Sequence, residues 1–220
     1  MKPFLPLILL TWFTWPVAAH AQSNPRLKHE LDSLYEVDQR YRAMLFDPRL
    51  NRKPDSLAAA LGVPPSELNA TIGERMRQAD ARNLSRVQAI LQQYGYPGKT
   101  LVGAPTNEAA WNVVQHNPAS IPRYLPLIKA AADRGELPFH RYATMLDRQL
   151  VNEGKAQRYG TQLQNFNGQP PFVWPIENPA QVNQLRRQAG FTQTVEQYAA
   201  TFGTAYRVLT LADVARLRQP

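Results

Sequence analysis

The chain has 220 residues, of which 44% are hydrophobic and 19% charged, and its formal net charge is +8 at pH 7. This length and composition suffice for one domain with a buried core and exclude a disordered chain. The sequence contains no cysteine, which excludes disulfides, a thiol nucleophile and a lipid-anchored amino-terminal cysteine. The basic residues are spread among Asp and Glu, so we interpret them as a solvated surface and expect no nucleic-acid partner.

The first 21 residues have the organisation of a secretory signal peptide. Lys2 lies near the start, an apolar run extends from Phe4 to Val17, and Ala19-His20-Ala21 has the small-x-small pattern of a cleavage site. The run is interrupted by proline and is short for a bilayer span, so we expect cleavage, and no integral membrane span elsewhere. The mature protein is therefore predicted to begin near Gln22 and to be periplasmic or secreted.

Two long helices are predicted in the first half of the mature chain. Apolar residues recur every three or four positions from Leu27 to Leu45, and again from Leu68 to Tyr94, as they do on one face of a helix. Asp38 interrupts the first apolar face, and Asn83 interrupts the second. A polar group on a buried face needs a partner, and Arg42, one turn after Asp38, is the nearest candidate.

A shorter helix is predicted after the turn Tyr96-Pro97-Gly98. Thr106 is its expected N-cap, Trp111 lies within it, and Pro118 follows its end. The pair Gln115-His116 therefore lies at a helix C-terminus, where the helix dipole favours the imidazolium and burial opposes it.

Two more helices are predicted, approximately from Ile121 to Arg134 and from Pro138 to Glu153, each followed by a glycine. Asp147 borders the apolar face of the second helix, and Arg148 follows it directly. Each helix that is predicted to be central thus brings a polar residue to its buried side.

A short β-hairpin is predicted near residues 163–176, after the run Gln157-Arg158-Tyr159-Gly160-Thr161-Gln162. Asn167-Gly168 has the preference for positive φ that a type I′ turn requires. A two-stranded ribbon is not stable alone, so we expect Phe166, Phe172 and Trp174 to hold it against the helices, where it would cover a site.

The C-terminal part is predicted to be helical again. Asn178 is the expected N-cap of a helix that begins at Pro179 and is stopped by Gly190, and less regular helices are expected at 195–206 and 211–217. The predicted fold is mainly α, a single helical-bundle domain at residues 22–198 with the small β-hairpin, followed by a C-terminal helical tail at 199–220.

Several of these motifs together resemble a bacterial family catalogued as domain of unknown function 6624. The resemblance extends approximately from Leu31 to Gly190, and its most specific part is the Tyr-Gly-Thr-Gln run with Gln-His upstream. The motifs that carry it are Asp38-Gln39 with Arg42, Gly95-Tyr96-Pro97-Gly98 with Val102-Gly103, Trp111 with Gln115-His116, Asp147-Arg148, Gln157-Arg158-Tyr159-Gly160-Thr161-Gln162, and Arg186-Arg187 with Gly190. The resemblance implies a shared fold and shared polar positions, and no activity. Pro48 to Pro65 resembles an insertion, and the tail beyond Tyr198 lies outside the resemblance.

The polar residues define one predicted site beneath the hairpin. The candidates for catalysis are His116, Asp147 and Asp38, and the candidates for ligand binding are Arg42, Asn83, Gln115, Arg148, Gln157, Tyr159, Thr161 and Gln162. The sequence contains neither a His-x-x-x-His pair nor a His-Glu-x-x-His motif, so we predict no metal and no cofactor.

Three functions remain open for this site. A binding module would take a small polar ligand or a peptide end in the helix-lined pocket. A cofactor-free hydrolase of cell-envelope material would use His116 as general base, with Asp38 or Asp147 orienting it and Arg148 or Arg158 holding an anionic intermediate. A purely structural or interaction protein would use the polar positions only to fix the register of the helices.

The predicted cleavage is tested by producing the full chain with a C-terminal tag in a bacterium and sequencing the amino terminus of the exported protein. We expect the sequence to begin at Gln22, because the residues at 19 and 21 are small. A control with Ala19→Leu and Ala21→Leu should stay uncleaved. A wild-type protein that retains Met1 would contradict the prediction.

Overall fold

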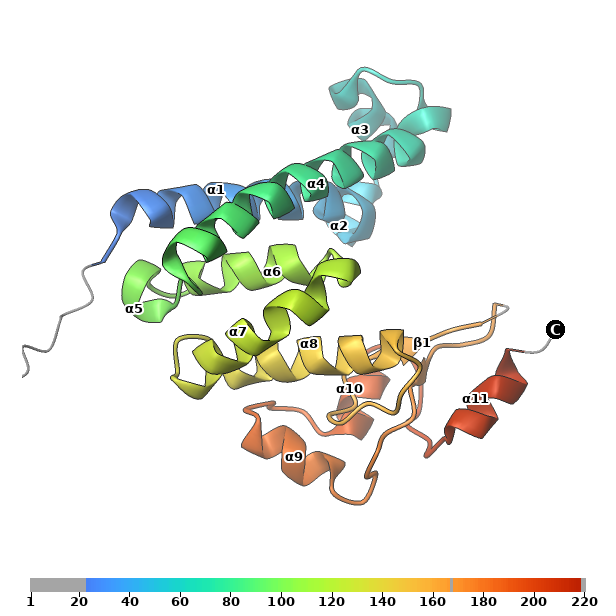
Figure 1. Cartoon of the computed structure of the whole chain (residues 1–220). Coiled ribbons are helices and arrows are strands. Elements are labelled where there is room, and N and C mark those ends of the chain that lie inside the picture. The colour runs from blue at the N-terminus through green and yellow to red at the C-terminus, as the bar shows by residue number, and fades with distance from the viewer. Residues whose placement is uncertain (1–22, 167, 219–220) are drawn as a thin grey trace, which may run out of the picture.

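The structure is a computed structural model that describes residues 23–166 and 168–218, without the side chain of Asn51. The predicted signal peptide and Asn167 lie outside the described residues. Within them, helices dominate and the only sheet has two antiparallel strands, so the predicted mainly α fold with a small hairpin is confirmed (Figure 1). No helix in the described ranges combines the length and apolarity needed to cross a bilayer.

The two long predicted helices are present as α1 (Pro25–Phe46) and α4 (Leu68–Tyr94), which run antiparallel side by side (Figure 1). The side chain of Asn24 caps α1 by accepting the N–H of Leu27, a contact worth about 1 kcal/mol in typical helices. The apolar faces predicted by periodicity meet each other, with Leu31 and Val87 fully buried.

The segment interpreted as an insertion forms the projecting arm of the molecule (Figure 1). It contains α2 (Pro48–Asn51) and α3 (Pro54–Leu61), and the 3-10 turn η1 (Pro65–Glu67) leads into α4. Ala58 and Ile72 are buried in a small core of the arm that is separate from the main one.

The helix that carries His116 lies beneath α1 and α4. It is α6 (Ala109–Gln115), preceded by α5 (Lys99–Val102) and the 3-10 turn η2 (Thr106–Glu108). The predicted N-cap role of Thr106 is wrong, because its hydroxyl donates to Asp32 Oδ1 in α1 at 2.6 Å instead. A tertiary partner therefore replaces the local one.

The next pair of helices follows the predicted bounds closely. After the 3-10 turn η3 (Pro118–Ser120), α7 (Ile121–Asp133) and α8 (Phe139–Asn152) pack antiparallel against each other. Gly135 turns the chain between them with a φ of 72°. Asp147, in α8, contacts the loop that follows this helix, whereas Arg148, the next residue, contacts Gln115 in α6.

The hairpin is present but its strands are short. β1 (Leu163–Gln164) pairs with β2 (Phe172–Val173), with Leu163 opposite Val173, so residues 165–171 form the connecting loop instead of a two-residue turn. Pro170 and Pro171 have no N–H to donate, and the ladder therefore ends before the Asn-Gly pair.

Three short helices complete the chain: α9 (Val182–Gln188), α10 (Val195–Ala200) and α11 (Leu211–Leu217). The predicted cap at Asn178 is wrong, because residues 179–181 form a turn and α9 begins three positions later than expected. The hairpin packs against α11, where Val214 contacts the buried Trp174 and the guanidinium of Arg218 lies 5.4 Å from its ring.

Candidate functional site

The end of α6 holds a histidine against a buried carboxylate. His116 Nδ1 lies 3.0 Å from Asp38 Oδ1, and Gln39 donates to the other oxygen of Asp38 at 2.7 Å. The Asp38 side chain is 1% exposed, whereas that of His116 is 18% exposed. Since Nδ1 faces the carboxylate, Nε2 is the ring nitrogen without a partner among the described residues.

Arg42 extends this contact into a chain of charges. Its Nη1 donates to Asp38 Oδ1 at 3.2 Å, and its Nη2 donates to both oxygens of Asp80 at 2.9 and 2.8 Å. The predicted Asp38–Arg42 pair is present, and Asp80 is a member that the sequence analysis missed. With two carboxylates and one guanidinium, a proton on His116 would make the cluster neutral.

His116 lines an open groove of about 470 Å³ between α4, η3 and the start of α7. The other lining residues are Leu84, Gln88, Asn117, Pro118, Ala119, Ser120 and Arg123. None of them is acidic, and no ion pair to Arg123 is present among the described residues. The groove therefore presents one guanidinium and one imidazole to a ligand, with no competing carboxylate on its walls.

The side chains of two further candidates from the sequence, Asn83 and Gln115, make hydrogen bonds inside the protein. Asn83 donates to the backbone carbonyl of Leu34 at 3.1 Å, which satisfies an amide on the apolar face of α4. Gln115 donates to Asn112 Oδ1 at 3.3 Å within α6. Neither residue is among those that line the groove of His116.

Asp147 organises the loop that follows α8. Its Oδ1 accepts the backbone N–H groups of Arg158 and Tyr159 at 2.8 and 3.0 Å, and its Oδ2 accepts the N–H and the hydroxyl of Thr161 at 3.0 and 2.9 Å. Burial raises the pKa of the Asp147 carboxyl, and these donors oppose that rise. Each oxygen of the Asp147 carboxylate thus accepts two hydrogen bonds from the protein, which leaves no lone pair for a substrate.

Arg186, in α9, holds the other side of the same loop. This arginine is 2% exposed, and its guanidinium donates to the carbonyls of Tyr159 and Gly160 at 2.9 and 3.3 Å and to Gln193 O at 2.9 Å. Burial lowers the pKa of the Arg186 guanidinium. From the sequence, Arg186 was only part of the Arg186-Arg187 motif, because a short helix with two consecutive arginines does not indicate which one is buried.

The remaining loop residues are also held by internal bonds. Gln157 is fully buried; its Oε1 accepts the N–H of Gln162 at 2.8 Å and its Nε2 donates to the carbonyls of Gln162 and Trp174. The ring of Tyr159 packs 6.4 Å from that of Phe191 and lines a separate hollow of about 220 Å³.

The predicted site therefore divides into two clusters, one around His116 and one around Asp147. Arg148 lies between them and donates to the backbone carbonyl of Gln115 at 3.0 Å, while burial lowers the pKa of its guanidinium. His116 and Tyr159 line different hollows, and the hairpin lies against α11, so these hollows are not the single covered cup that the sequence suggested.

The chain matches a family described as a family of unknown function, DUF6624, over residues 25–210. It belongs to that family. The DUF6624 match includes both polar clusters and the projecting arm, and it extends beyond the stretch from Leu31 to Gly190 on which the resemblance was noted. Comparison with curated proteins and with solved structures gives no match.

Within residues 23–166 and 168–218 of this DUF6624 protein, no three His, Asp or Glu side chains are placed together so as to hold a metal ion.

Replacing Asp147 tests its role in this DUF6624 protein. We expect Asp147→Asn to lower the free energy of unfolding by about 2–4 kcal/mol. The NH₂ group of the asparagine would replace one carboxylate oxygen, so the buried N–H groups that this oxygen accepts would lose their acceptor. Urea denaturation measures the change. Asp133→Asn, at an exposed i,i+4 pair with Lys129, is the control and should change stability by less than about 0.5 kcal/mol. Equal effects of the two substitutions would contradict the anchoring role.

Proposed function

We propose that this is an exported protein that binds a small acidic ligand, or the carboxyl end of a peptide, in the groove at the end of α6. The observation that carries the proposal is the fixed orientation of His116, whose Nδ1 faces Asp38 and whose Nε2 is left for a ligand. Export rests on the signal-peptide pattern of the first 21 residues.

The composition of the groove supports an acidic ligand over a neutral one. Arg123 and His116 are its ionisable lining residues, and Gln88 adds an amide with both donor and acceptor atoms. The side chains of Asn117 and Ser120 also line the groove, but their donors bond to the backbone carbonyls of Val113 and Asn117. A volume of about 470 Å³ falls within the range of about 300–1,000 Å³ that is usual for small-molecule sites. An anion bound there would meet the guanidinium of Arg123, and His116 would donate Nε2–H to it when both ring nitrogens carry a proton, without displacement of an internal carboxylate.

A hydrolase that uses His116 as general base is the second candidate. Its support is the same Asp38–His116 contact, because a carboxylate at Nδ1 fixes the tautomer in which Nε2 can accept a proton from water. Asp38 is the orienting carboxylate in this proposal, since the oxygens of Asp147 are already occupied.

The binding proposal is tested by titrating the mature protein with acetate, succinate, glucuronate and an acetylated dialanine peptide, using thermal shift and calorimetry. We expect at least one of these acids to raise Tm in a dose-dependent manner. His116→Asn keeps a side-chain donor for Asp38 but removes Nε2, so it should weaken binding about tenfold or more while retaining the fold.

Arg123→Gln should weaken binding similarly, while Arg187→Gln, at an exposed arginine of α9 outside the groove, serves as the matched control. Loss of binding in the Arg187→Gln control would contradict the proposal. A wild-type protein that binds none of the four acids would contradict it as well.

The hydrolase proposal makes a different prediction for the same variant. Chromogenic esters, amides and glycosides of envelope type are incubated with wild-type protein and with His116→Asn. A general base contributes about 10²–10⁴ to the rate, so the variant should lose at least about a hundredfold in kcat. Turnover that is absent in the wild type, or unaltered in the variant, would reject the catalytic role.

A further inference from the structure

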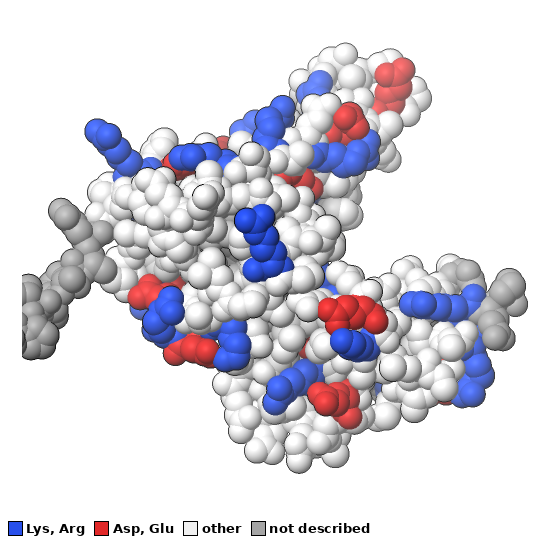
Figure 2. All heavy atoms as spheres, viewed as in Figure 1, with Lys and Arg blue, Asp and Glu red and all other residues white. Residues whose placement is uncertain are grey.

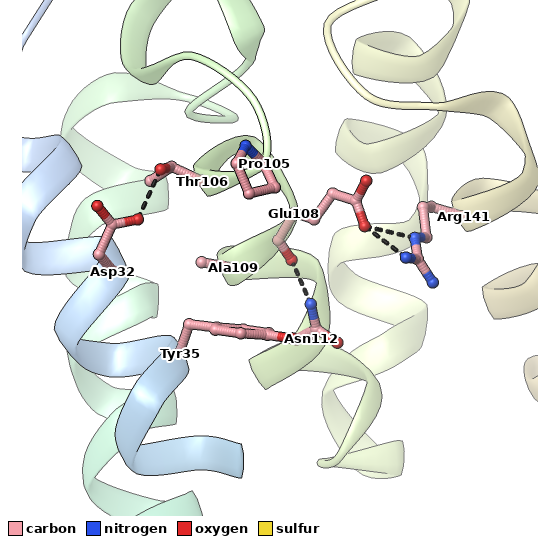
Figure 3. Close-up of a pocket in the computed structure, with 8 residues that line it drawn as sticks. All are labelled: Asp32, Tyr35, Pro105, Thr106, Glu108, Ala109, Asn112 and Arg141. Carbon is pink, nitrogen blue, oxygen red and sulfur yellow. Dashed lines mark hydrogen bonds and ion pairs between the residues drawn. The ribbon is translucent and has the colours of Figure 1, made fainter.

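A third hollow lies one to two turns away from His116, where α6 faces α1. It has a volume of about 130 Å³ and is lined by Asp32, Tyr35, Pro105, Thr106, Glu108, Ala109, Asn112 and Arg141 (Figure 3). Asp32 and Thr106 form one side, Glu108 and Arg141 the other, and the ring of Tyr35 extends toward Asn112 (Figure 3).

The lining of this hollow holds more carboxylates than guanidinium groups. Asp32 and Glu108 contribute two carboxylates and Arg141 one guanidinium to the lining, and the ammonium of Lys28, outside the lining, pairs with Asp32 at 2.6 Å. Partial burial opposes ionisation of Asp32, but hydrogen bonds from Lys28 and Thr106 outweigh it and lower the pKa of the Asp32 carboxyl. The Asp32 carboxyl is therefore available as an anion near neutral pH.

The internal contacts leave acceptor atoms open. Arg141 directs two nitrogens to the same oxygen of Glu108, Oε2, at 2.7 and 2.5 Å, and its guanidinium lies 4.8 Å from the centre of the Trp111 ring. Glu108 Oε1 has no hydrogen-bond partner among the described residues. Asp32 Oδ1 accepts the Thr106 hydroxyl, and the cation that pairs with Oδ2 is Lys28, about half exposed.

We propose that this hollow is a binding site for a small organic cation with a primary ammonium group. The ammonium has three N–H donors. Glu108 Oε1 is open to one of them, and the oxygens of Asp32 and Asn112, which already accept one hydrogen bond each, have a second lone pair for the others, while the face of Tyr35 offers a cation–π contact. The volume corresponds to roughly four water molecules at about 30 Å³ each, which suits a ligand of about four to six heavy atoms. Arg141 disfavours a doubly charged cation and holds Glu108 in place. The site is separate from the groove of His116 and does not depend on its function.

The experiment is calorimetric titration of the mature wild-type protein with ethanolamine and ethylammonium, with acetamide and acetate as probes of similar size. Both ammonium compounds should bind and the other two should not. Asp32→Asn and Glu108→Gln each keep an acceptor for Thr106 or Arg141 and should raise Kd about tenfold or more. Binding of acetate to the same extent, or of no ammonium compound, would overturn the proposal.

A matched control separates the hollow from general surface charge. Lys129–Asp133 has the same i,i+4 spacing and 2.6 Å distance as Lys28–Asp32, with nearly equal exposure, so Asp133→Asn should leave Kd unchanged. If a variant does not fold, NMR of the wild type decides. Ethanolamine should shift the amide signals of Ala109 and Asn112 and leave those of Gln88 in place, and the reverse pattern would overturn the assignment.

Discussion

The C-terminal half of the molecule depends on a buried carboxylate and a buried guanidinium that hold opposite sides of one loop. Asp147 accepts the N–H groups of residues 158, 159 and 161, while Arg186 donates to the carbonyls of residues 159 and 160. The loop has too little regular structure to satisfy these groups itself, and an unsatisfied buried group costs about 1–3 kcal/mol. Gly160 fits between the two with a φ of 67°, where a Cβ would lie 2.8 Å from Val195. Backbone hydrogen bonding thus explains the Tyr-Gly-Thr-Gln run on which the resemblance was noted.

The long helices and their polar interruptions were predictable, because a period of 3.6 residues is a local signal. The separation of the candidate site into two clusters was not, since it depends on how α8 packs relative to α6. Asp80 was missed for a related reason: it follows the buried Ala79 and looks like a solvent-facing acid until Arg42 is placed opposite it. Thr106 had a valid local capping pattern, and only the approach of α1 redirected its hydroxyl to Asp32.

Surface charge gives little guidance to function in this protein. On the face seen in Figure 2, cations and acids are interspersed over all the visible elements, with no large patch of one sign. The hollows differ from the surface because their linings differ in charged groups. The groove of His116 is lined by Arg123, His116 and neutral residues, whereas the hollow beside Tyr35 is lined by two carboxylates and one guanidinium. Ala109 and Asn112 of α6 line the hollow beside Tyr35, and His116, directly after α6, lines the groove, so neighbouring stretches of chain contribute to both.

The completeness of hydrogen bonding separates the structural polar residues from the functional candidates. Three polar residues are buried and have hydrogen-bond partners inside the protein: Asp147, Gln157 and Asn83. Their role in fixing the positions of helices and loops is sufficient to explain them. His116 differs, because only one of its ring nitrogens is engaged although Asp38 already has donors from Arg42 and Gln39. If His116 served only to neutralise Asp38, it would not need to line a groove. The partial satisfaction of His116, next to a guanidinium that has no acidic partner among the described residues, is what favours a ligand over a purely structural role.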